Sequence, residues 1–142
     1  MNKTDKSIHN ICVASIKRST IKPYDFKWTR FYETNSGFPY SGIISALEET
    51  ELIICSTVID NNNFSILTTR RLLTQQGGQL YSGKIQGATD RLYGEFKGYK
   101  DKDFTLGLVQ LANGKELSYF IETGRASMVM IHGVRTLIRI TR

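Results

Sequence analysis

Cysteine and proline are both scarce in this sequence, with two of each among 142 residues. Two cysteines form one disulfide at most, which excludes the small secreted domains that depend on several disulfides. Two prolines and twelve glycines exclude proline-rich and collagen-like chains. No apolar run approaches the roughly 18 residues of a membrane-spanning helix, and the first residues lack the apolar stretch of a signal peptide.

Both cysteines have apolar neighbours, in Ile-Cys-Val around Cys12 and Ile-Ile-Cys at Cys55. Cysteine in such surroundings is commonly a free, buried thiol, and that state persists in a reducing compartment. We therefore expect a cytoplasmic protein. Whether Cys12 pairs with Cys55 stays open at this point.

Residues that carry catalysis or bind metals are also few. Histidine occurs only at His9 and His132, and neither has a second ligand at metal-binding spacing. The sequence contains no Gly-x-Ser-x-Gly elbow and no phosphate-binding glycine loop with a lysine. It thus predicts no catalytic residue, no metal and no cofactor. One enzymatic alternative stays open, a dispersed site in a pocket that combines His132 with a carboxylate such as Glu95 or Glu122.

The composition is that of one globular domain, with 40% hydrophobic and 23% charged residues. Lysine and arginine outnumber aspartate and glutamate by 19 to 13, which gives a net charge of +6. Much of this excess lies in residues 1–40, which hold seven basic and three acidic side chains. A basic chain favours anionic partners such as nucleic acid, a lipid surface or a phosphorylated ligand.

Hydrophobic periodicity predicts a series of short strands that ends in a helix. The helix over 126–141 is the clearest element, and Gly133 in its apolar stripe is expected to allow close approach to a sheet. Asn113-Gly114 predicts a type I′ hairpin between strands at 104–111 and 116–122. Further strands are predicted at 24–28, 52–59, 64–69, 70–74, 80–83 and 92–99, with helices at 42–50 and at 7–18, where a strand over 11–16 stays open.

Strands first and a helix last indicate an α+β fold with an antiparallel sheet. The stretch Leu67-Thr-Thr-Arg-Arg-Leu72 follows an acidic and aliphatic lead-in, Glu51-Leu-Ile-Ile54, and precedes a Gly-Gly turn. This order resembles the bacterial pleckstrin-homology-like (PH-like) domains over about residues 41–142. The resemblance implies a bent antiparallel β-barrel or sheet of about seven strands capped by a C-terminal α-helix. Residues 1–40 would form an N-terminal extension, basic and aromatic-rich, packed on that domain.

Phosphoinositide-binding members of this family usually carry lysine and arginine around the first hairpin loop. The corresponding loop here is Asp60-Asn-Asn-Asn63, so the resemblance does not extend to that ligand. We expect a non-enzymatic PH-like binding module that recognises a protein or peptide partner, at an open sheet edge or beside the terminal helix. A role as an immunity protein against a toxin also stays open, although those that inhibit nucleases tend to be acidic.

Three groups of residues are candidates for the binding surface. Basic and aromatic side chains alternate in residues 17–32, which makes weak binding of anionic lipid or nucleic acid the alternative function, although the same rings suit a core. The Arg-Arg pair at 70–71 favours a role in the fold. Arg135, Arg139 and Arg142 on the outer side of the terminal helix, with His132 beside them, suit either an anion or the helix dipole. The candidate binding residues are Lys22, Lys27, Trp28, Arg30, Arg70, Arg71, Arg135 and Arg139.

Overall fold

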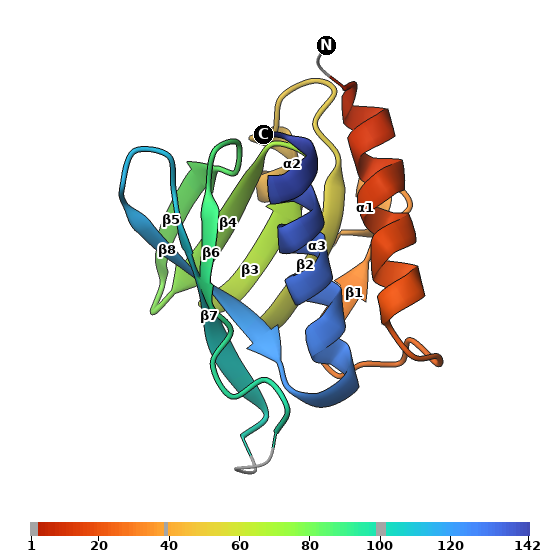
Figure 1. Cartoon of the computed structure of the whole chain (residues 1–142), viewed down its shortest axis with the longest axis vertical. Coiled ribbons are helices and arrows are strands. Elements are labelled where there is room, and N and C mark those ends of the chain that lie inside the picture. The colour runs from red at the N-terminus through yellow and green to blue at the C-terminus, as the bar shows by residue number, and fades with distance from the viewer. Residues whose placement is uncertain (1–2, 39, 99–101) are drawn as a thin grey trace.

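The structure is a computed structural model that describes residues 3–38, 40–98 and 102–142. It has the α+β architecture predicted from the sequence, with a helix at each end of the series of strands (Figure 1). The elements in chain order are α1 (Asp5–Ser19), β1 (Thr29–Phe31), a 3-10 turn (Asn35–Gly37), α2 (Ser41–Ser45), β2 (Ile53–Asp60), β3 (Asn63–Thr68), β4 (Arg71–Gln76), β5 (Gln79–Lys84), β6 (Thr89–Leu92), β7 (Phe104–Gln110), β8 (Glu116–Glu122), a second 3-10 turn (Gly124–Ala126) and α3 (Ser127–Ile140).

The strands form two antiparallel sheets. The larger has the order β1-β2-β3-β4-β5 and the smaller the order β6-β7-β8, so each strand pairs with its neighbour in sequence. An antiparallel sheet with a C-terminal helix is therefore confirmed, whereas a closed barrel is not formed. Among the described residues no ladder joins β5 to β6, and the chain between them turns at Gly87, where φ is +81°.

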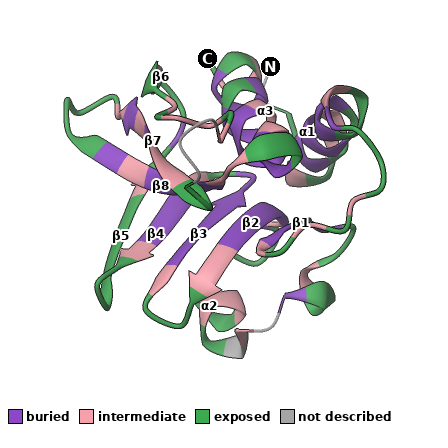
Figure 2. Ribbon diagram, turned by 90° about the horizontal axis from the view of Figure 1, so that it is seen from below, coloured by how far each residue is buried: buried purple, intermediate pink, exposed green. Residues whose placement is uncertain are grey.

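The main core lies between the two helices α1 and α3 and the inner faces of both sheets (Figures 1 and 2). The predicted apolar stripe is buried at Val129, Met130, Val134 and Leu137 of α3 and at Ala126 of the 3-10 turn before it. Gly133 has the expected role, because a Cβ atom there would lie 3.0 Å from Sγ of Cys55 and 3.1 Å from a methyl group of Leu67. Helix α3 can approach the sheet this closely only without a side chain at that position.

Residues 1–40 contribute a helix and a strand to this same core. The open choice over 11–16 is settled as helix, and the Thr4 hydroxyl caps α1 by accepting from the Ser7 N–H at 3.1 Å. Cys12 and Ile16 are fully buried, and β1 pairs with β2. Cys12 and Cys55 are free thiols, and burial raises the pKa of Cys12 to about 12. Within the described residues no helix has both the length and the apolarity to cross a bilayer.

Two predicted strands are wrong. Residues 24–28 are not a strand, because β1 starts only at Thr29. Their aromatic alternation arises in a loop whose rings pack on the domain, as Tyr24 does edge-on against Phe31 at a centroid distance of 5.0 Å. The strand expected at 92–99 ends instead at Leu92, since residues 93–98 form a loop with positive φ at both of its glycines. Residue 99 lies outside the described residues.

The predicted helix at 42–50 and the predicted type I′ hairpin also need correction. Helix α2 stops at Ser45 after five residues. In the β7–β8 loop, the Gly114 N–H bonds the Leu111 carbonyl at 2.9 Å and the Leu111 N–H bonds the Lys115 carbonyl at 2.7 Å. These bonds define a three-residue loop with Gly114 at a φ of +88°. The two-residue turn with positive φ at both positions occurs instead at residues 77–78, between β4 and β5.

Candidate functional site

The basic and aromatic segment at residues 17–32 does not form a platform on which bases could stack. Trp28 is half-buried and packs edge-on against Phe104, with ring centroids 6.1 Å apart. Nζ of Lys27 lies 4.6 Å from the centre of the Trp28 ring, so these two predicted binding residues form a cation–π contact with each other. Lys22, in the loop after α1, and Arg30, on β1, are exposed.

Arg71, the first residue of β4, forms an ion pair with Glu51. Its Nε and Nη2 atoms donate to the two carboxylate oxygens of Glu51 at 2.9 and 2.7 Å. Glu51 is only 1% exposed, and it also accepts from the hydroxyl of Thr68 and from the Glu48 N–H at 3.0 Å. Burial alone raises the pKa of Glu51, but the hydrogen bonds from Arg71 and Thr68 outweigh it and lower that pKa. The Glu51 carboxylate therefore stays ionised inside the fold.

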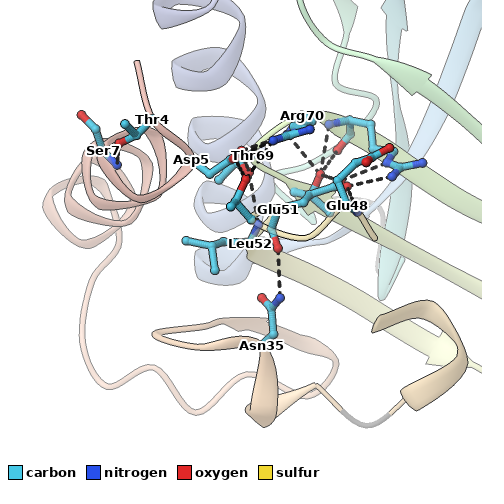
Figure 3. Close-up of polar contacts among 12 residues, drawn as sticks. Thr4, Asp5, Ser7, Asn35, Glu48, Glu51, Leu52, Thr69 and Arg70 are labelled. Carbon is cyan, nitrogen blue, oxygen red and sulfur yellow. Dashed lines mark hydrogen bonds and ion pairs between the residues drawn. The ribbon is translucent and has the colours of Figure 1, made fainter. Parts of the chain in front are cut away.

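Arg70 makes a second ion pair that fastens helix α1 to the larger sheet. Its Nε and Nη2 atoms donate to the carboxylate of Asp5 at 3.1 and 2.8 Å, and Asp5 also accepts from the hydroxyls of Thr50 and Thr69 (Figure 3). The Arg70 guanidinium holds the pKa of Asp5 at about 2. Both arginines of the 70–71 pair thus have contacts that stabilise the fold.

Arg135 and Arg139 are exposed on the outer side of α3, where they line a surface hollow together with His132. Burial and the charge of Arg135 lower the pKa of His132. Neither carboxylate expected beside this histidine lines the hollow. Glu122 instead accepts from the backbone N–H groups of residues 27 and 28, at 3.0 and 2.7 Å. The carboxylate that shares this hollow with His132 is Asp90 rather than Glu95 or Glu122, and an enzymatic role of His132 stays a prediction.

The edge of β8 is closed by hydroxyl groups of the larger sheet. The Phe120 N–H donates to Oγ of Ser65, and the Thr74 hydroxyl donates to the Ser118 carbonyl, both at 2.7 Å. The hydroxyls of Ser65 and Thr74 are hydrogen-bonded to each other at 2.8 Å. These side chains satisfy the backbone of β8 where the two sheets meet, so this edge does not accept another strand.

The edges formed by β1 and β6 are short. Strand β1 has three residues and β6 has four. The ladder between β6 and β7 is also interrupted by a register shift between Asp90 and Leu92. Short strands and bulges are ordinary ways in which proteins prevent further pairing at an edge.

Strand β5 is a longer edge with a regular ladder, since it pairs with β4 at six consecutive positions without a register shift. The two-residue turn at 77–78 makes Gln76 and Gln79 a hydrogen-bonded pair. The bond from the Ile85 N–H to the Arg70 carbonyl, at 3.2 Å, shows that the same alternation holds at the other end. The backbones of residues 79, 81 and 83 are therefore directed toward β4.

Leu80, Ser82 and Lys84 consequently direct their backbone N–H and C=O groups away from the sheet. In the part of the chain that the structure describes, no strand pairs along this side of β5. Figure 2 shows β5 at the margin of the sheet, exposed along almost its whole length. The strand has no proline and no bulge, and Lys84 at its end is its one charged residue. Strand β5 therefore lacks nearly all of the features by which proteins usually prevent further pairing at a sheet edge.

Apolar side chains and a hollow accompany this open edge. Leu80 is 50% exposed and Tyr81 is 47% exposed, although both are large hydrophobic residues. A hollow of about 460 Å³ lies between β4–β5 and the β7–β8 hairpin, with Leu111 and Leu117 in its lining. Gly83 admits the hairpin, since a Cβ atom there would lie 2.3 Å from Leu111. A strand added to β5 would place side chains beside this hollow.

None of the eight candidate residues chosen from the sequence lies on β5. The signal that could have found the site is the pair of adjacent large apolar residues, Leu80 and Tyr81, in a segment without a buried face.

No family model matches the chain, and no similar curated protein or solved structure was found. Among the described residues, no group of three or more histidine, cysteine, aspartate or glutamate side chains is arranged to hold a metal ion.

Proposed function

We propose that the chain is a non-enzymatic PH-like binding module that recognises an extended segment of a protein or peptide partner by adding it as a strand to β5. The observation that carries this proposal is the row of unpaired backbone groups at Leu80, Ser82 and Lys84. In strand addition, main-chain hydrogen bonds supply affinity and side-chain pockets supply specificity. The hollow beside Leu80 and Tyr81 offers such a pocket.

The order of elements supports the PH-like part of the proposal. The described part of residues 41–142 contains seven strands, β2 to β8, followed by a 3-10 turn and α3. This is the number and order that the resemblance implies. Helix α1 and strand β1 are additions to that pattern, and they lie away from the open edge at the opposite end of the larger sheet (Figure 1).

Binding of anionic lipid or nucleic acid through residues 17–32 has less support. The aromatic rings of this segment make intramolecular contacts, as Trp28 does with Phe104 and Lys27. Single-stranded nucleic acid is bound by exposed rings that stack on bases. The partner that the described surface fits best is therefore a polypeptide in extended conformation.

Replacement of Ser82 by proline tests the proposal. The Ser82 N–H is directed outward, so Ser82→Pro removes a donor from the open edge without removing a bond to β4. Ser82→Ala keeps the N–H and is the matched control. Peptides are selected from a phage-displayed random library on the full chain, labelled with fluorescein and titrated against the three proteins by fluorescence anisotropy.

We expect Ser82→Pro to weaken peptide binding by at least about tenfold, which is the loss of roughly 1.4 kcal/mol expected when a backbone hydrogen bond is removed and a ring obstructs the edge. Ser82→Ala should stay within about twofold of the wild type. Circular dichroism confirms that both variants are folded. Equal affinities of the proline and alanine variants, or a selection that yields no binding peptide, would contradict strand addition at β5.

A further inference from the structure

A second surface of the molecule, which shares no residue with the edge of β5, is rich in arginine. It is a hollow of about 440 Å³ over the outer side of α3, between α1 and β6. Four arginines line it: Arg18 at the end of α1, and Arg135, Arg139 and Arg142 on α3 and just beyond its end. Side chains from two helices and a terminal segment thus bring their positive charges to one place.

These four guanidinium groups have no ion-pair partner among the described residues. The ion pairs found between described residues use other cations, namely Lys17, Arg70, Arg71 and Arg125. Like charges at positions i and i+4, as at Arg135 and Arg139, repel each other on a helix surface. An arrangement that brings such groups together without an ion pair to any of them is well suited to an anionic ligand.

One carboxylate, Asp90 of β6, also lines the hollow. Its Oδ2 accepts from the Tyr93 hydroxyl at 2.9 Å, and its Oδ1 is covered and has no hydrogen-bond partner. Burial raises the pKa of Asp90. A single carboxylate set against four arginines leaves the hollow strongly positive, so the matching ligand carries more than one negative charge.

The dipole of α3 does not account for the cluster. A helix dipole favours cations within about the last turn. Arg139 lies in the last turn of α3, but Arg135 lies one turn farther from the end and Arg18 belongs to the other helix.

We propose that this hollow is a binding site for a small ligand that carries two or more adjacent phosphoryl groups. Guanidinium groups are planar forks whose N–H donors match phosphate oxygens in pairs. The volume is in the range of small-molecule sites. No ring of phenylalanine, tyrosine or tryptophan lines the hollow for stacking on bases, and none of the large exposed apolar side chains lies there to enter a membrane. This inference is independent of strand addition at β5.

Tripolyphosphate is the probe, titrated into the full chain by isothermal titration calorimetry at physiological salt, with orthophosphate for comparison. The double variant Arg135→Gln/Arg139→Gln removes two of the arginines. The control Lys6→Gln/Lys102→Gln removes the same charge from two exposed side chains that do not line the hollow. All four positions are exposed, so both variants should fold, and circular dichroism checks this.

We expect wild-type chain to bind tripolyphosphate at least tenfold more tightly than orthophosphate, because several arginines then act together. The Arg135/Arg139 variant should lose at least 100-fold in affinity, and the control should stay within about threefold. Absence of tripolyphosphate binding to the wild type would overturn the proposal, as would an equal loss in both variants. Binding of a labelled oligonucleotide or of anionic vesicles without tripolyphosphate binding would also overturn it, and would assign this face to a macromolecular polyanion.

Discussion

Replacing Glu51 with alanine should be among the most destabilising polar substitutions in this chain. The Glu51 side chain is fully covered, and its carboxylate is held by Arg71 at 2.9 and 2.7 Å, by the Thr68 hydroxyl and by the Glu48 N–H at 3.0 Å. Its removal leaves the Arg71 guanidinium without a carboxylate in a partly buried position. Breaking a buried ion pair in this way destabilises a protein by about 3–5 kcal/mol. The Arg71 side chain keeps 27% exposure, which places the expected loss near the lower value, about 3 kcal/mol.

Urea denaturation followed by circular dichroism measures this loss. For a chain of this size, 3 kcal/mol corresponds to a fall of roughly 6–12 °C in Tm. Glu49→Ala removes the same side chain from an exposed neighbouring position and should change stability by less than about 0.5 kcal/mol. The double variant Glu51→Ala/Arg71→Ala should lose less than the sum of the two single variants, because the pair acts as a unit. A loss below about 1 kcal/mol for Glu51→Ala, or additivity in the double variant, would refute the reasoning.

Three further predictions concern other parts of the fold. Because the folded-state pKa of Asp5 is about 2, below its ordinary value of 3.8, its contribution is present above pH 3.8 and is lost as pH falls toward 2. Asp5→Asn should remove about 1–2 kcal/mol of pH-dependent stability in that window, after allowance for solvent screening, and identical acid unfolding of variant and wild type would contradict this. Gly107→Ala should destabilise the chain by about 1–3 kcal/mol, because its Cβ would lie 2.5 Å from Cζ of the buried Tyr119, and an unchanged urea midpoint would argue against that packing. The buried Cys12 thiol, whose pKa is raised to about 12, should react with a thiol reagent only on unfolding, and rapid labelling of the native chain would show that it is accessible.

The parts of the fold that could be predicted from the sequence are those with a strong one-sided pattern. The stripe of α3 identified both the helix and its buried face, and Gly133 identified the point of closest approach to the sheet. The rings at Tyr24 and Trp28 alternate like a strand, but period-two spacing also occurs where a loop packs successive rings on a domain. The sequence predicts too long a helix at α2, because the apolar residues of this segment belong to a small second core.

The candidate site was harder to predict, because it depends on pairing rather than on residue type. Leu80 and Tyr81 resemble core residues in the sequence, and only the order of strands reveals that β5 is an edge. A role of Arg70 and Arg71 in the fold was expected, but their partners Asp5 and Glu51 lie 65 and 20 residues away. Similarly, Arg18 joins Arg135 only because α1 packs beside α3.

Amide hydrogen exchange along β5, measured by NMR on the free chain and on its complex with a selected peptide, tests strand addition most directly. We predict little protection at Leu80, Ser82 and Lys84 in the free chain, alternating with protected amides at Gln79, Tyr81 and Gly83 that bond to β4. Bound peptide should then slow exchange at the three outward amides. Two results would contradict the account. One is uniform protection of the amides of residues 79–84 in the free chain, and the other is unchanged exchange at the three outward amides when the peptide is bound.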